Sequence, residues 1–122
     1  MKKFVLAVMV VLSSLVFGDY LEDKLEMKLL RSYPRLTDGV NKMSIKEYDV
    51  DVKKDRVEIE IKVPKELARE QFSKLNKDGL EKELEKIVAD VRKELNDNIP
   101  VKVEIEVEKE SSSSKKLYSN YL

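Results

Sequence analysis

Six carboxylates are the side chains of this sequence with the clearest capacity for chemistry. They stand at alternate positions of three otherwise apolar segments: Asp49, Asp51, Glu58, Glu60, Glu104 and Glu106. Because successive side chains of a strand point to opposite faces, they should gather on one face of a sheet. Crowded there, they could hold a hard cation such as Ca²⁺ or raise one another's pKa values for acid–base work.

A solvated face with cross-strand ion pairs is the favoured interpretation of this acidic face. Lys46, Lys62 and Lys102 are interspersed with the carboxylates, and no Asp-x-Asp-x-Asp-Gly loop accompanies them. We therefore assign no metal-binding residue from the sequence, and keep divalent-cation binding on this face as an alternative.

Other chemistry finds little support in the composition. The chain has no His and no Cys, which removes the commonest general base, the thiol nucleophile and the usual ligands of zinc. Gly39 and Gly79 are too far apart to form a phosphate-binding loop, and the serines at 111–114 have no histidine partner. Tyr33 and Tyr48 could line a pocket, but their spacing favours the core. We expect no enzyme activity, no catalytic residue and no cofactor.

Three predicted strands position the carboxylates. Apolar residues alternate with charged ones over residues 48–52, 57–63 and 101–107. The first two flank a short polar turn at 53–56, which predicts an antiparallel hairpin with Val52 opposite Val57. The third strand follows Pro100.

Helical periodicity occupies the segments on either side of the hairpin. A first helix is expected over residues 19–33, with Leu21, Leu25, Leu29, Leu30 and Tyr33 on one side and Pro34 at its end. Residues 34–43 are expected to be a connection held to the core by Leu36, Val40 and Met43. Residues 65–95 predict a kinked helix or two helices broken near Gly79, with a capping-box start at Asp78 and Glu81. The second part has an unbroken apolar stripe: Leu80, Leu84, Ile87, Val88, Val91 and Leu95.

These elements predict an α+β domain over residues 19–110. Their order is helix, strand, strand, helix, strand, which gives a three-stranded mixed sheet with helices packed on one face.

The first eighteen residues are typical of a cleavable signal peptide. Lys2 and Lys3 precede an apolar segment, and Val16 and Gly18 suit a signal-peptidase site. An uncleaved anchor is the alternative, although residues 4–17 fall short of the roughly 20 that a spanning helix needs. Cleavage would remove two of 24 basic residues and none of 24 acidic ones, leaving a charge of −2. We therefore expect a protein exported to the periplasm or the extracellular space. The nearly balanced charge argues against a nucleic-acid partner. The Lys- and Glu-rich composition is like that of thermophilic proteins.

The C-terminal segment has no obvious packing role. Residues 111–122 form a serine-rich linker and a tail with four large apolar side chains: Leu117, Tyr118, Tyr121 and Leu122. We expect this tail either to fray or to dock, on its own domain or on a partner.

The element order resembles, at the level of topology, the BON domain, a small module associated with bacterial envelopes. Residues 25–36 are similar to that family's leucine-bearing helix ending in proline and leucine. Residues 50–59 resemble its strand, tight turn and second strand, and residues 63–66 its exit into a helix. Arg56 and Ile61 stand where that family has glycines. The resemblance implies an interaction module for phospholipid surfaces or envelope proteins, without a cofactor.

The sequence therefore predicts an exported, non-enzymatic protein-interaction domain of the cell envelope or periplasm. Its partner would be an envelope protein or a second copy of the chain, bound by strand addition at a sheet edge. The C-terminal tail could be the added strand, from its own chain or from another copy. A module that binds phospholipid surfaces, or a divalent cation on the acidic face, is the alternative.

Overall fold

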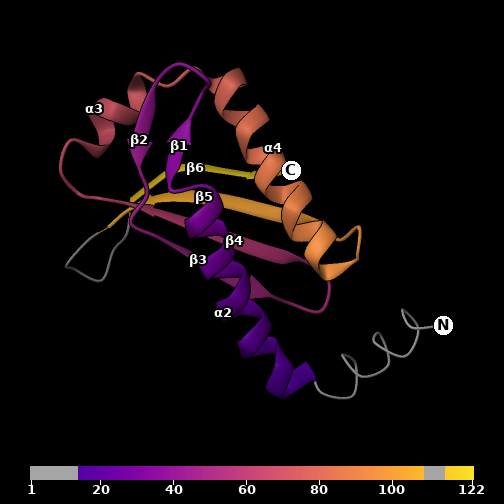
Figure 1. Cartoon of the computed structure of the whole chain (residues 1–122). Helices are drawn as coiled ribbons and strands as arrows, with labels where there is room; N and C mark the ends of the chain where they lie inside the picture. Colours follow the sequence, from indigo (N-terminus) through magenta and orange to yellow (C-terminus); the bar gives the residue numbers. More distant parts are fainter. Residues whose placement is uncertain (1–13, 109–114) are drawn as a thin grey trace.

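The computed structural model describes residues 14–108 and 115–122, which form an α+β domain (Figure 1). The predicted fold class is confirmed. The described elements are α2 (Ser14–Ser32), β1 (Arg35–Thr37), β2 (Lys42–Ser44), β3 (Glu47–Val52), β4 (Val57–Val63), α3 (Ala68–Ser73), α4 (Lys77–Leu95), β5 (Val101–Val107) and β6 (Lys115–Tyr121). Residues 1–13 of the expected signal peptide and the expected linker at 111–114 lie outside the described residues.

The main sheet has four strands in the order β3-β4-β5-β6, which corrects the expected three. β3 and β4 are antiparallel, with Val52 opposite Val57 as predicted, and β4 and β5 are parallel. The fourth strand is the C-terminal tail, which pairs antiparallel with β5. The expected three-strand sheet omitted it because the apolar residues of the tail do not alternate regularly, and a bulge opposite Ile105 and Glu106 accommodates that irregularity.

The core lies between the apolar face of the sheet and α4. Five residues of the predicted stripe are buried there: Leu80, Leu84, Ile87, Val88 and Val91. The last, Leu95, is partly buried against them. Each such side chain contributes about 1.5 to 3 kcal/mol when removed from water. The stripe therefore serves the core.

Helix α2 lies against β3 (Figure 1). It begins at Ser14, before the expected start, and ends at Ser32 ahead of Pro34. Leu25 and Leu29 are buried, whereas Leu30 is exposed. No helix in the described part of the chain is long and apolar enough to span a bilayer.

A small hairpin replaces the expected connection after α2. β1 and β2 pair with Leu36 opposite Met43, and both side chains are buried as expected. Val40, expected to anchor this segment, is instead 84% exposed at the hairpin tip, next to Gly39, whose φ of 97° requires a left-handed conformation.

The tip of this hairpin is fixed to the junction of α3 and α4. The side chain of Asp38 accepts hydrogen bonds from the N–H groups of Val40, Asn41 and Asn76 at 2.8, 2.6 and 2.7 Å. These bonds, that of Asn76 first, hold the pKa of Asp38 far below its usual range. Asp38 thereby ties the hairpin to the start of α4.

The break between the two helices differs in detail from the expected one. Asn76, and not Asp78, caps α4, because its side chain accepts the N–H of Gly79 at 2.9 Å. Gly79 lies inside the helix, where a Cβ would stand 2.3 Å from the carbonyl oxygen of Asp38. The glycine thus allows the hairpin to approach the helix closely.

Candidate functional site

The acidic face is the side of the sheet opposite the core. Cross-strand register places Asp49 beside Glu60, and Glu60 beside Glu104, so that three carboxylates form one row across three strands. Glu106 lies two positions further along β5, beside Lys62 and Lys116. The sheet therefore brings the predicted carboxylates together, as the alternation indicated.

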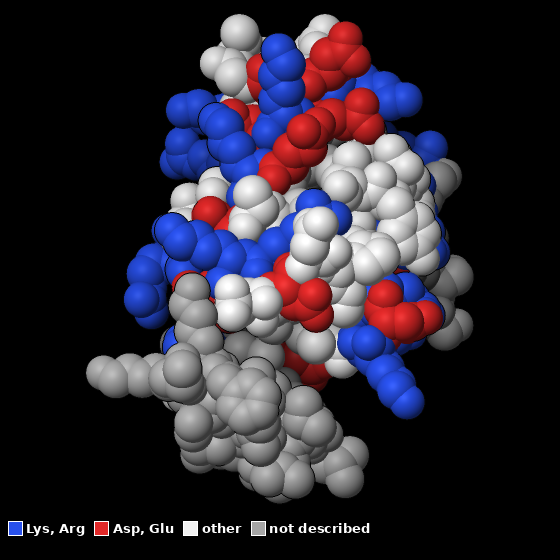
Figure 2. All heavy atoms as spheres, turned by 90° about the vertical axis from the view of Figure 1, so that its right-hand side faces the viewer, with Lys and Arg blue, Asp and Glu red and all other residues white. Residues whose placement is uncertain are grey.

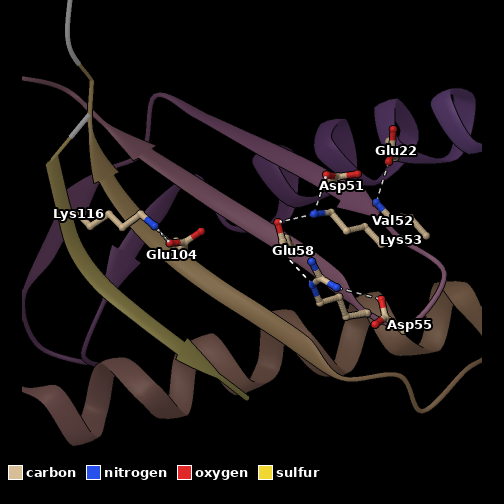
Figure 3. A network of polar contacts seen from close by, with 9 residues as sticks. Glu22, Asp51, Val52, Lys53, Asp55, Glu58, Glu104 and Lys116 are labelled. Carbon is tan, nitrogen blue, oxygen red and sulfur yellow. Dashed lines mark hydrogen bonds and ion pairs between the residues drawn. The ribbon is translucent and has the colours of Figure 1, made fainter. Parts of the chain in front are cut away.

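The end of this face near the β3–β4 turn is ion-paired. Lys53 lies 3.8 Å from Asp51 and 3.3 Å from Glu58 (Figure 3). Arg56 donates to Glu58 at 2.9 Å. The hydrogen bond from Arg56 is the main cause of the lowered pKa of Glu58. Such exposed pairs each contribute about 0 to 1 kcal/mol. The expected solvated, ion-paired face is confirmed at this end.

The centre of the face differs from that expectation. Glu104 and Glu106 are only 5% and 6% exposed. Lys116 of β6 forms an ion pair with Glu104 (Figure 3), whereas Glu106 has neither a hydrogen bond nor an ion pair with any described residue. The prediction of solvated side chains is wrong here because the fourth strand places β5 inside the sheet, where side chains of both neighbouring strands flank its carboxylates.

Three carboxylates converge at this centre. Oxygen atoms of Glu60, Glu104 and Glu106 all lie within 4.8 Å of one another. Burial, followed by the charges of Glu106 and Asp49, raises the pKa of Glu60. The cluster thus concentrates negative charge where little water reaches it.

The two outer edges of the sheet differ in the hydrogen-bond partners of their outward main-chain N–H groups. On β3, the N–H groups of Val50 and Val52 point away from β4, and α2 supplies a carboxylate to each of them. Glu26 accepts from Val50 and Glu22 from Val52, both at 2.7 Å (Figure 3 shows the second). Burial raises the pKa of Glu26, and the bond from Val50 opposes this rise. The β3 edge is therefore occupied by side chains of its own chain.

The edge formed by β6 is not occupied in this way. Leu122 donates its N–H to Val101 O at 2.9 Å, so by alternation the N–H groups of Ser119 and Tyr121 point outward. Tyr121 donates to the side chain of its own neighbour Asn120 at 2.9 Å. Among the described residues, no side chain from another element binds a main-chain N–H of β6.

The tail residues singled out from the sequence divide between core and surface. Leu117, Tyr118 and Leu122 pack against the core, and the Tyr118 hydroxyl donates to Glu81 at 2.8 Å. Tyr121 is 54% exposed. The tail thus docks on its own domain, and its docking on a partner stays a prediction.

The two tyrosines considered for a pocket also serve the fold. Tyr48 is buried and its hydroxyl donates to Tyr33 O at 2.6 Å. The Tyr33 hydroxyl is hydrogen-bonded to Asp90 of α4. The favoured core interpretation is confirmed for Tyr48, while Tyr33 is partly buried at the margin of the core.

The outer side of α2 combines basic and apolar side chains. A hollow of about 670 Å³ is lined by Tyr20, Asp23, Lys24, Met27, Lys28, Arg31 and Ser32. Tyr20 and Met27 are well exposed. Elsewhere the surface mixes both signs of charge, as on the α4 side of the molecule in Figure 2, in keeping with a formal net charge of zero.

No family model, curated protein or solved structure matches this chain. The resemblance to the BON domain therefore stays a prediction from the sequence.

Proposed function

We propose that this protein is a non-enzymatic interaction domain of the cell envelope or periplasm that binds an extended protein segment along the outer edge of β6. The contrast between the two sheet edges carries this proposal. One edge is closed by Glu22 and Glu26 of the same chain, whereas on the other the outward N–H of Ser119 has no hydrogen bond to any described residue and that of Tyr121 is bonded only to its neighbour Asn120. An edge with free main-chain groups is the template that strand addition requires.

The side chains of β6 suit such an edge. Ser119 and Asn120 are exposed. The Asn120 side chain accepts the Tyr121 N–H, so an added strand would pair with the Ser119 N–H and would displace Asn120 to reach that of Tyr121. Tyr121 adds an exposed aromatic ring, a residue type enriched at the centre of protein interfaces. The β3 edge would then be protected against unwanted pairing while β6 stays available.

The experiment compares Ser119→Pro with Ser119→Ala. Proline at position 119 removes the outward N–H donor and places its ring on the outer edge of β6. It breaks no hydrogen bond to β5, because the N–H at this position points away from β5. Binding is measured in all three proteins as mass by light scattering over a range of concentrations, and in wild type and Ser119→Ala also as the protection of the residue 119 amide from hydrogen exchange. We expect association, with a second copy or a purified envelope partner, in wild type and Ser119→Ala but not in Ser119→Pro. Equal association by both variants would refute strand addition at β6.

Export to the envelope is supported by the N-terminal sequence. Cleavage after Gly18 would leave the α2 side chains that contact the sheet, including Glu22, Leu25 and Glu26. Mass spectrometry of protein recovered from fractionated native cells tests this part: absence from the envelope and secreted fractions would contradict export, and an envelope form that still carried Lys2 and Lys3 would contradict cleavage.

A phospholipid surface is a second candidate partner, favoured by the outer side of α2. Exposed Tyr20 and Met27 alternate there with Lys24 and Arg31, a pattern typical of helices that lie on anionic membranes. Sedimentation with phosphatidylglycerol vesicles at low salt should remove wild-type protein from solution. The double variant Lys24→Glu/Arg31→Glu should stay soluble, and Lys82→Glu on α4 is the control. No sedimentation of wild type would exclude this candidate.

A further inference from the structure

The centre of the acidic face holds more negative charge than its neighbours compensate. Glu104 has one cation, Lys116, and Glu106 has no hydrogen bond or ion pair within the described ranges although it is 94% buried. Oε2 of Glu104 is itself buried and, apart from the ion pair with Lys116, has no hydrogen-bond partner among the described residues. Like charges this close repel one another, and a cation placed between them would offset that repulsion.

The spacing of the carboxylates fits a single ion. Two oxygen ligands at about 2.4 Å from one Ca²⁺ can stand at most about 4.8 Å apart. Oxygen atoms of Glu60, Glu104 and Glu106 meet this limit pairwise, and the three residues come from two adjacent strands at the middle of the sheet. Little backbone movement is therefore needed for all three to reach one ion.

We propose that Glu60, Glu104 and Glu106 form a site for a hard divalent cation of the calcium class. The donors are carboxylate oxygens alone, and the chain has no His or Cys to attract softer metals. Three carboxylates leave several coordination positions for water, which Ca²⁺ accepts readily in irregular geometries. A dissociation constant of about 10⁻⁴ to 10⁻³ M is expected, as for calcium sites of extracellular modules.

Lys116 is the competitor of the ion at this site. Its ammonium group already pairs with Glu104 (Figure 3), and that hydrogen bond raises the pKa of Lys116. A cation entering the cluster must displace this ammonium group or share Glu104 with it. Since Lys116 is the second residue of β6, cation binding would also loosen the start of the strand whose outer edge carries the proposed interaction.

Calorimetric titration of the purified protein with Ca²⁺ at pH 7.5 and low salt tests the site, with Mg²⁺ titrated separately and the melting temperature measured in parallel. Wild type should show saturable heat and a higher melting temperature with Ca²⁺. Glu106→Gln and Glu60→Gln should each lose both responses, whereas Glu70→Gln, an exposed carboxylate of α3, should keep them. Lys116→Gln should bind Ca²⁺ about tenfold more tightly, because a positive charge beside the carboxylates is removed.

Each outcome decides the proposal. The absence of heat and of a melting shift in wild type would overturn it, as would undiminished Ca²⁺ binding by both Glu106→Gln and Glu60→Gln. Weaker binding by Lys116→Gln would refute the competition. These variants leave Ser119 unchanged, so failure of the cation site and failure of strand addition at β6 are distinguished.

Discussion

Replacing Glu26 with alanine tests whether α2 closes the β3 edge. The change removes the carboxylate that accepts the Val50 N–H at 2.7 Å. A hydrogen bond to a charged group contributes about 1.5 to 3 kcal/mol. Burial of this carboxylate opposes ionisation, as its raised pKa shows, so we expect a loss of about 1 to 2 kcal/mol. In a domain of this size, each kcal/mol lowers the melting temperature by about 4 to 8 °C.

The assay is urea denaturation followed by circular dichroism, with mass determined by light scattering. Glu26→Gln is the matched control, because its amide oxygen can still accept from Val50 without the cost of burying a charge. Glu26→Ala should be less stable than Glu26→Gln and should form oligomers through the opened edge. A Glu26→Ala protein that was monomeric and as stable as wild type would refute the role of α2 in closing this edge.

The pH dependence of the same pair gives a second check. A raised carboxyl pKa favours the folded state most at pH values below the unfolded pKa, here 4.5. That contribution is lost as pH rises through the folded pKa. Wild type should therefore lose stability relative to Glu26→Gln as pH rises through and above 4.5. If wild type instead gained stability relative to Glu26→Gln as the pH rose above 4.5, the inference that burial raises the pKa of Glu26 would be contradicted.

Three further predictions concern the core and the hairpin contact. Leu84→Asp places an unpaired charge in a fully buried position and should unfold the domain, with loss of the helical dichroism signal; a folded variant that had lost only partner binding would contradict this assignment. Gly79→Ala should destabilise the protein by about 1 to 3 kcal/mol in urea titrations, because its Cβ would meet Asp38 O, while the exposed helix variant Lys77→Ala should have little effect. Asp38 has a lowered pKa, so its contribution to stability is complete above pH about 3.8 and is lost as the pH falls below that value toward its folded pKa. Asp38→Asn should therefore be less stable than wild type at pH 6 and should lose less stability on acidification. Identical acid titrations of the two proteins would contradict this.

The regular elements could be predicted because their side chains repeat with a clear period. The α4 stripe, the β3–β4 hairpin with Val52 opposite Val57, and the alternation in β5 follow from local patterns. Periodicity did not predict β6 as a fourth strand, since its bulge breaks the alternation and its pairing with β5 is a tertiary contact; only the option that the tail adds to a sheet edge pointed to it. The β1–β2 pair is only three residues on each side, too short for a periodic signal.

For the candidate sites too, local periodicity could be predicted from the sequence, whereas features that depend on tertiary contacts could not. Alternation placed all six carboxylates on one face, but the depth of Glu104 and Glu106 depends on a strand that the periodicity did not reveal. The hydrogen bonds that Glu22 and Glu26 accept from the outer edge of β3 were also not predicted. Glu22 and Glu26 stand four positions apart on a helix rich in charged residues, and nothing in the sequence distinguishes them from solvated side chains. Their role depends on the position of the helix along β3.

The parallel pairing of β4 with β5 has a consequence for folding kinetics. Val57 pairs with Val101, 44 residues further along the chain, so this contact requires closure of a long loop, whereas each antiparallel hairpin can form locally. The hairpins β3–β4 and β5–β6 should therefore appear first and join last through their inner strands. Until they join, β4 and β5 are both unpaired on one side, and at high protein concentration a β5–β6 hairpin can combine with the β3–β4 hairpin of another molecule. Refolding yield should accordingly fall with concentration even when the native protein is monomeric.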